Sequence, residues 1–154
     1  MKIKSFFKKY IPWYCIDEKI YKLYLKGHKN YLKKNNLIVD YYNYKIQKKY
    51  NCIISSRAFI EDKISFPHPI GIVIGKDVKV GKNVTIYQQV TLGQNNGKFP
   101  TIGDNVIIYS GAKIFGDIHI GNNVIIGANS VVNTDVPDNC IVAGVPARVI
   151  RKND

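Results

Sequence analysis

The chain has 154 residues, of which 45% are hydrophobic, and its formal net charge is +12. This length allows one folded domain with an appendage and excludes two independent domains, and no apolar stretch is long enough to cross a membrane. The three cysteines form no Cys-x-x-Cys pair, which argues against a disulfide framework or a zinc ribbon and favours a reducing, cytoplasmic compartment.

Residues 1–50 form a basic segment that is rich in tyrosine. They contain thirteen Lys and three acidic residues, a net charge of 13 − 3 = +10, and nine of the eleven Tyr. Apolar residues at helical spacing predict one helix that begins near residue 16 and a second helix over residues 38–50. The expected buried faces consist of Ile16, Ile20, Leu23, Tyr24 and Tyr31 in the first helix and of Ile38, Tyr42, Ile46 and Tyr50 in the second.

Two interpretations of this basic segment remain open. It can cap the domain that follows, with its tyrosines packed inward and its lysines in water, or it can contact an anionic membrane surface as a peripheral protein. Nucleic acid is not expected as a partner, because no recognised binding motif accompanies the charge.

A six-residue period governs residues 51–154. One branched aliphatic series consists of Ile74, Val80, Ile86 and Leu92, then Ile102, Ile108, Ile114, Ile120, Ile126 and Val132. A small or apolar residue stands four positions after each member except Leu92, and Ile54, Ile60 and Phe66 extend the series backwards. A helix repeats every 3.6 residues and a strand every two, whereas a period of six is typical of a β-solenoid. The sequence therefore predicts an all-β, parallel β-helix of roughly four coils, spaced about 4.8 Å apart, after a short α-helical segment.

Two breaks in this register matter most for function. Eight residues instead of six separate Phe66 from Ile74, and ten residues instead of six separate Leu92 from Ile102. Insertions in solenoids form external loops, commonly on the binding face. Since the two breaks fall about one coil apart, we expect them to flank one cleft, with His68 on one wall and the Gly/Asn-rich loop on the other.

Of the three histidines, His68 is the candidate catalytic residue. It lies between Pro67 and Pro69, which restrict the backbone on both sides, and an imidazole can accept a proton from an attacking alcohol near neutral pH. We expect His28 to be solvated within the lysine-rich helix and His119 to lie on the outer surface. One chain cannot bring His68 and His119 together, so no metal site is expected.

Three motifs carry a resemblance to a known family. They are Pro67-His68-Pro69-Ile70-Gly71-Ile72-Val73-Ile74-Gly75, Val90-Thr91-Leu92-Gly93 and Ala143-Gly144-Val145-Pro146-Ala147-Arg148. In this order they resemble hexapeptide-repeat acyltransferases of the serine acetyltransferase type, over residues 51–152. The resemblance implies a left-handed β-helix, acetyl-CoA as acyl donor, a homotrimer with active sites between adjacent subunits, and His68 as general base.

The resemblance also implies where coenzyme A lies. Backbone amides beside small residues hold the pantetheine arm in the family, and these positions match Ser110, Gly111 and Ala112 and, one coil later, Gly127 and Ala128. Basic residues after the last coil, Arg148 and Lys152, are candidates for the phosphates of CoA, with a solvated basic tail as the alternative. Asn95 and Lys98 in the inserted loop are candidate substrate contacts, with a purely flexible loop as the alternative.

The acceptor side departs from the family pattern. Pro67 and Ile53 stand where serine acetyltransferases have aspartates, and Phe99 stands where they have a histidine. A site that binds the ammonium and carboxylate of serine would lose its partners, whereas Phe99 suits the apolar face of a sugar ring. Without the familiar aspartate, a backbone carbonyl, Glu61 or Asp62 remains to orient His68.

We therefore expect an O-acetyltransferase of polysaccharide biosynthesis. It would transfer acetyl from acetyl-CoA directly to a hydroxyl of a bacterial glycan (capsule, O-antigen or lipid-linked precursor), with no covalent enzyme intermediate. The alternatives are serine O-acetylation, N-acetylation of an amino sugar and, from another class, a catalytically silent trimeric scaffold.

Overall fold

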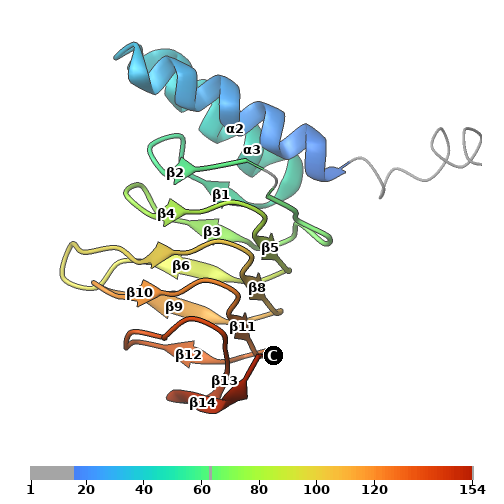
Figure 1. Cartoon of the computed structure of the whole chain (residues 1–154). Helices are drawn as coiled ribbons and strands as arrows, with labels where there is room; N and C mark the ends of the chain where they lie inside the picture. The colour runs from blue at the N-terminus through green and yellow to red at the C-terminus, as the bar shows by residue number, and fades with distance from the viewer. Residues whose placement is uncertain (1–15, 63, 154) are drawn as a thin grey trace, which may run out of the picture.

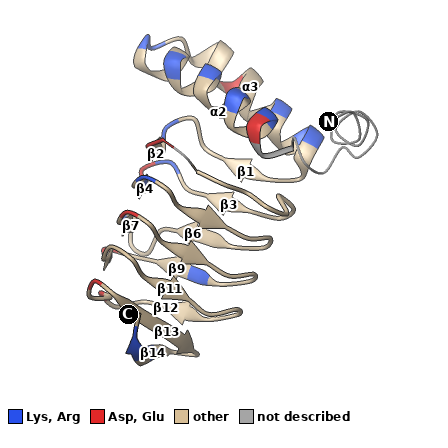
Figure 2. Ribbon diagram, turned by 45° about the vertical axis from the view of Figure 1, so that its right-hand side comes forward, with Lys and Arg blue, Asp and Glu red and all other residues tan. Residues whose placement is uncertain are grey.

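The computed structural model describes residues 16–62 and 64–153 and shows a stack of β-coils capped by two helices (Figure 1). Helix α2 spans Ile16–Leu32 and helix α3 spans Asn36–Tyr50. No helix among the described residues is long and apolar enough to span a bilayer. The described lysines before the first coil are exposed, and Figure 2 shows basic positions distributed along the two helices.

The two helices seal the first coil through buried apolar and aromatic side chains. Ile20, Tyr24 and Ile46 are fully buried. The Tyr24 hydroxyl donates to the carbonyl oxygen of Ala58 at 2.8 Å and accepts from the amide of Ile60 at 3.1 Å. A tyrosine therefore pairs two backbone groups at the open end of the stack, which would be costly to bury alone.

Two expectations for the helices need correction, and a third, the burial of Ile16, is not tested. In α3, Val39 is buried in place of Ile38, because the helix turns Val39, together with Ile46, towards the core and leaves Ile38 38% exposed. His28 is half-buried: its Nδ1 lies 2.9 Å from the carbonyl oxygen of Ser56 and its ring contacts those of Tyr24 and Phe59. The side chain of Ile16 lies outside the described part of the chain, as does Cys15.

The coils form three parallel sheets. The first sheet contains β1 (Ile53–Ile54), β3 (Val73–Ile74), β6 (Thr91–Gly93), β9 (Lys113–Phe115) and β12 (Val131–Val132). The second contains β2 (Phe59–Ile60), β4 (Lys79–Val80), β7 (Thr101–Ile102) and β10 (His119–Ile120). The third contains β5 (Thr85–Ile86), β8 (Ile107–Ile108), β11 (Ile125–Ile126), β13 (Cys140–Gly144) and, antiparallel to it, β14 (Ala147–Lys152).

This arrangement confirms the predicted β-helix. In each two-residue strand the second residue points inward, and every member of the aliphatic series from Ile74 to Val132 is buried. Corresponding residues stack on one another between coils, as Ile74 does on Leu92 and Leu92 on Ile114. Each coil thus buries its apolar side against its neighbours, as expected for a solenoid.

The three corners between the sheets are the places where the coils differ. Corner A joins the first sheet to the second, corner B the second to the third, and corner C the third to the first. Corner B carries a ladder of asparagines, Asn83, Asn105, Asn123 and Asn139, whose side chains hydrogen-bond from coil to coil at 2.9–3.1 Å. All four have positive φ, between 55° and 57°. Asparagine suits this corner because it tolerates the left-handed conformation and can pair with its copy above.

Candidate functional site

His68 lies at corner C of the first coil, where the register break begins. Pro69 is buried and its carbonyl oxygen accepts a hydrogen bond from the Cys52 thiol at 3.2 Å. The amide of Ile70 donates to the carbonyl oxygen of His68 at 2.8 Å, which closes a tight turn. Burial raises the pKa of the Cys52 thiol, so Cys52 is a packing group here. The corner is held from inside while the imidazole stays exposed.

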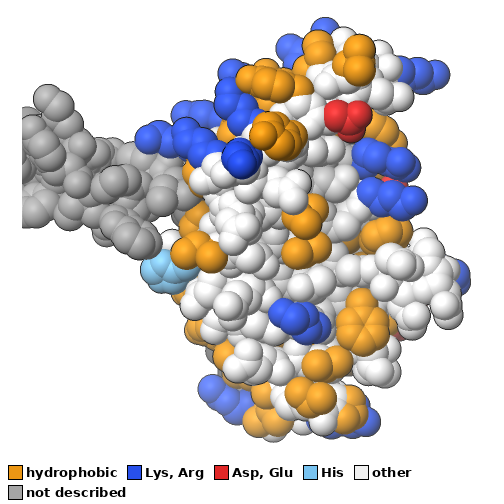
Figure 3. Space-filling view, turned by 180° about the vertical axis from the view of Figure 1, so that it is seen from behind, with side chains coloured by type: hydrophobic (Ala, Val, Ile, Leu, Met, Phe, Trp, Pro, Cys, Tyr) orange, Lys and Arg blue, Asp and Glu red, His pale blue; other side chains and the backbone are white. Residues whose placement is uncertain are grey.

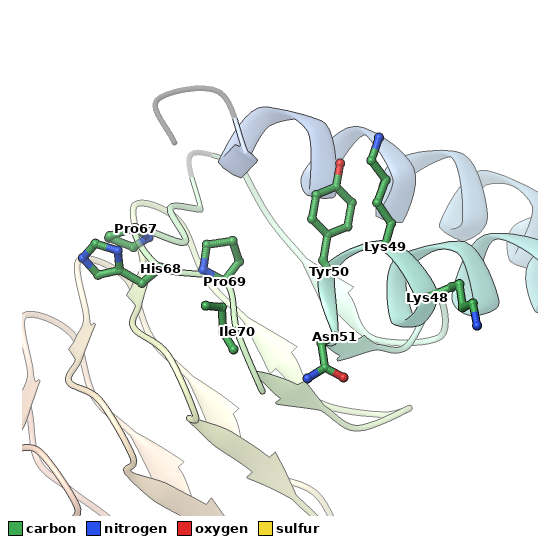
Figure 4. A pocket seen from close by; sticks show the side chains of 8 residues that line it. All are labelled: Lys48, Lys49, Tyr50, Asn51, Pro67, His68, Pro69 and Ile70. Atoms are coloured by element: carbon green, nitrogen blue, oxygen red, sulfur yellow. The ribbon is translucent and has the colours of Figure 1, made fainter. Parts of the chain in front are cut away.

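A cavity of about 400 Å³ lies beside this turn. It is lined by residues 67–70 and by the end of α3, namely Lys48, Lys49, Tyr50 and Asn51 (Figure 4). In Figure 4 the His68 ring points away from α3, and the Lys48 and Lys49 side chains are directed away from His68. None of these lining residues is acidic. The imidazole is therefore accessible from the outer side of corner C as well as next to the cavity.

Two tyrosines continue from His68 along corner C. The ring of Tyr87, just after β5, lies 6.3 Å from the His68 ring, centroid to centroid. The ring of Tyr109, just after β8, stacks on Tyr87 at 5.2 Å with an interplanar angle of 21°. Sequence reasoning missed this aromatic column, although Tyr87 and Tyr109 are the only tyrosines after residue 50 and each follows an inward isoleucine.

Gln88, beside Tyr87, was also missed. Its side-chain oxygen is buried and has no hydrogen-bond partner among the described residues. Its backbone carbonyl accepts from the amide of Gly111 on the next coil at 2.9 Å. A buried unpaired acceptor is rare in folded proteins, and it adds a second unusual feature to the corner that holds His68. Nothing in the hexad pattern marks a corner glutamine.

The residues proposed to orient His68 lie elsewhere. Glu61 and Asp62 are at corner B, where the Glu61 carboxylate lies 3.6 Å from the Lys82 ammonium. No described residue hydrogen-bonds to the His68 imidazole; its aromatic neighbour is Tyr87. The expectation that Glu61 or Asp62 fixes the tautomer is therefore wrong, because the third-sheet position at Ser65 separates corner B from corner C, where His68 lies.

The expectation that the two register breaks of one chain flank a single cleft is also wrong. The inserted loop, residues 94–100, lies at corner A between β6 and β7, while His68 lies at corner C. Asn95 and Lys98 exchange two backbone hydrogen bonds at 3.0 Å, and the Lys98 ammonium pairs with Asp117, which raises the Lys98 pKa. Phe99 packs over Gly75, where an added Cβ would lie 2.7 Å from the ring. One break follows a third-sheet strand and the other a first-sheet strand, so they open at different corners.

The small residues expected to contact CoA share corner C with His68. The amides of Gly111, Ala112 and Gly127 already donate to backbone carbonyl oxygens. Those of Ser110 and Ala128 have no partner among the described residues. Of the five positions expected to contact CoA, only these two therefore have a backbone amide that is free to bind a ligand.

The other candidates lie apart from this corner. Arg148 and Lys152 are exposed on β14 at the far end of the stack, and the Arg148 guanidinium donates to the carbonyl oxygen of its neighbour Ala147 at 2.8 Å. His119 is exposed on β10, as expected, with its amide bonded to Asp135. Within residues 16–62 and 64–153 no three metal-ligating side chains gather at one point.

Two family models match the coils. Residues 67–95 match the hexapeptide repeat of succinyl-transferase, and residues 99–134 match the bacterial transferase hexapeptide model of six repeats. The first match contains His68 and Gln88, and the second contains Ser110 to Ala128 of corner C.

Relatives of known sequence and structure agree with these matches. The serine acetyltransferase of Staphylococcus aureus strain N315 is 45% identical over 104 residues, which are 65% of this chain and 46% of that protein. The enzyme of Staphylococcus xylosus is 38% identical over 134 residues, 84% of this chain and 62% of that one. The chain spans about half the length of the curated relatives it matches.

Solved structures give the same fold. The serine acetyltransferase of Neisseria gonorrhoeae superimposes with a TM-score of 0.84 at 31% identity, over 88% of this chain and 53% of that one. A serine acetyltransferase in complex with CoA gives 0.81 at 35% identity, over 85% and 55%. These relatives carry the serine acetyltransferase name, which favours the serine alternative over the expected glycan preference. The repeats of residues 67–95 and 99–134 place this β-helix in the hexapeptide-repeat acyltransferase family.

Proposed function

We propose that this protein transfers the acetyl group of acetyl-CoA to the hydroxyl group of a small acceptor, with L-serine as the first candidate. The observation that carries the proposal is the placement of His68, exposed at a proline-held register break inside a stretch that is 45% identical to a serine acetyltransferase. Solved relatives are described in complex with CoA and with serine, which supports both substrates. Acetyl-CoA as donor fits a cytoplasmic setting.

His68 is the general base of the proposed reaction. Its neutral imidazole takes the proton of the acceptor hydroxyl as the hydroxyl oxygen attacks the thioester carbonyl carbon. The tetrahedral intermediate then collapses, the carbon–sulfur bond breaks, and the leaving CoA thiolate takes the proton back from the imidazolium. A backbone amide near the corner stabilises the oxyanion. No residue becomes acetylated.

The proposed path of CoA follows corner C. The amides of Ser110 and Ala128 lack partners among the described residues and are the donors available for the pantetheine amide groups. The exposed Arg148 and Lys152, beyond the last coil, are proposed to meet phosphate oxygens. Gly111, Ala112 and Gly127 contribute the absence of bulky side chains rather than free amides.

A second copy of the chain is proposed to complete the site. His68 and the inserted loop lie at different corners of one chain, so Asn95, Lys98 and Phe99 can approach an acceptor at His68 only from an adjacent subunit. A homotrimer with one site at each interface meets this requirement. Phe99, which packs on Gly75, would then shape the loop more than it contacts the acceptor.

A glycan hydroxyl is the second candidate acceptor. The stacked rings of Tyr87 and Tyr109 favour it, because Tyr87 lies next to His68, Tyr109 extends the column with 40% of its surface exposed, and an aromatic face can pack on the apolar face of a sugar. The serine reading predicts no use for this column.

Thiol release from acetyl-CoA tests the proposal. Purified protein is assayed with L-serine, with amino sugars and with a panel of neutral oligosaccharides, and the product is identified by mass spectrometry. Release with serine supports the first candidate, and release with an oligosaccharide alone supports the second. No release with any acceptor, together with no CoA binding by calorimetry, would leave the scaffold reading.

A further inference from the structure

The turn between α2 and α3 exposes apolar side chains among lysines. We name as the hairpin tip Leu32, Lys33, Lys34, Leu37, Ile38 and Tyr41. Leu37 is 85% exposed, Leu32 64% and Tyr41 53%. These side chains are not part of the hydrophobic core, since the buried contacts of the two helices are made by Ile20, Tyr24, Val39 and Ile46. The tip therefore displays apolar surface that the described fold leaves uncovered.

Positive charge surrounds this apolar surface. Lys29, Lys33, Lys34 and Lys45 are exposed on the two helices and on the turn between them. Asp40, between Ile38 and Tyr41, is the single acidic residue within residues 29–45. Figure 3 shows hydrophobic side chains interleaved with lysines over the helical cap. A patch that combines exposed leucines with several lysines matches a surface that offers both an apolar layer and negative charge.

We infer that the hairpin tip docks on an anionic lipid surface. Leu32, Leu37 and Ile38 enter the headgroup region, and the flanking lysines meet lipid phosphates, as in interfacial helices. A second copy of this chain is a poor occupant, since it would bring the lysines of two tips together. An acidic polymer would use the lysines but gain nothing from the leucines.

This docking leaves the His68 site open. The tip lies at the start of α3, and the cavity beside His68 lies at its end, near Tyr50. Helix α3 has 15 residues, so the two ends are separated by about 22 Å at 1.5 Å per residue. Membrane contact and acetyl transfer therefore use separate surfaces, and the docking inference stands independently of the proposed function.

Co-sedimentation of the full chain with vesicles tests the inference. The probes are vesicles of phosphatidylcholine alone and vesicles in which phosphatidylglycerol replaces part of it. We expect binding to the anionic vesicles that weakens with salt. The double variants Leu32→Ser/Leu37→Ser and Lys33→Gln/Lys34→Gln should each bind about tenfold or more weakly.

Matched variants elsewhere on the chain are the controls. Val149→Ser/Ile150→Ser removes two exposed apolar residues at the far end of the stack, and Lys76→Gln/Lys79→Gln removes two exposed charges from the coils. Both should bind like the unaltered protein, and circular dichroism should show all four double variants folded.

Several outcomes would overturn the inference. They are equal binding to neutral vesicles, undiminished binding of both tip variants, and equal losses in the control variants. Vesicle binding that the lysine variant loses and the leucine variant retains would show a purely electrostatic contact, as an acidic polymer also makes, and would overturn the docking of the apolar side chains. A change in oligomeric state in the leucine variant, without vesicle binding, would indicate a second copy.

Discussion

Corners B and C are built by the same six-residue repeat but have opposite characters. Corner B repeats one residue in each coil, and its asparagines satisfy one another in a continuous ladder. Corner C changes from coil to coil, with two prolines and His68, then two stacked tyrosines, then small residues with unpaired amides. The regular corner stabilises the stack, and the irregular corner carries the exposed and unsatisfied groups that a ligand can use.

The asparagine ladder gives the largest expected change in stability. Asn105→Ala removes two side-chain hydrogen bonds and puts alanine, which tolerates the left-handed conformation less well than asparagine, at φ 57°. We expect a loss of about 1–3 kcal/mol in the free energy of unfolding, measured by urea titration. Asn105→Gly should lose less, since glycine adopts positive φ freely. A loss of acetyl-transfer rate in a variant that remains folded would contradict the view that corner B is purely structural.

Tyr24 tests the cap that closes the stack. Tyr24→Phe leaves the carbonyl of Ala58 and the amide of Ile60 unpaired and should cost about 1–2 kcal/mol. Burial raises the pKa of Tyr24 to about 12 from 10.0. The folded state thus favours the neutral phenol, so its stability is retained below pH 10 and declines as the pH rises towards 12. Tyr24→Phe should flatten this alkaline decline, and an unchanged decline would exclude Tyr24 as its cause.

The aromatic column separates acceptor binding from stability. Tyr109→Ala removes an exposed ring that stacks on Tyr87, so the melting temperature should change little. If corner C binds the acceptor, KM for the acceptor should rise several-fold while kcat falls less, because stacking supports binding more than chemistry. Tyr44→Ala, at an exposed tyrosine of α3, is the matched control and should leave KM unchanged.

The smallest effect is expected at corner A. Lys98→Gln breaks an ion pair with Asp117 whose two side chains are both exposed, so thermal unfolding should not change measurably. A rise in acceptor KM would support a loop that approaches His68 from the adjacent subunit. Unchanged kinetics would assign the ion pair to loop ordering alone.

The six-residue repeat made the β-helix predictable, whereas the structure of its corners was harder to predict. The aliphatic series from Ile74 to Val132 identifies the inward positions, because one strand and one corner together take six residues. The same counting identified His68 as an interruption. It failed for the loop at residues 94–100, because a break adds residues without stating which corner it extends. His28 was misplaced because its lysine neighbours suggested solvent, while its contact with Ser56 depends on how α2 crosses the coil.

The helix faces and the aromatic column show a further limit. Ile38 and Val39 are both apolar, and the orientation of α3 on its neighbours, which the sequence pattern does not specify, decides that Val39 is buried. Tyr87 and Tyr109 are 22 residues apart in sequence, since the inserted loop separates their coils, so no simple period links them. Only the stacking of β5 on β8 brings the rings together.

The most direct test compares His68→Ala with His119→Ala in the acetyl-CoA thiol-release assay. The two histidines are both exposed on the coils, but His68 interrupts the repeat and His119 lies on a regular strand. With the acceptor that the unaltered protein uses, His68→Ala should lower kcat/KM by about 10²–10⁴-fold and His119→Ala should have no effect. Turnover by His68→Ala at the unaltered rate would remove the imidazole from the mechanism and corner C from its role as the site.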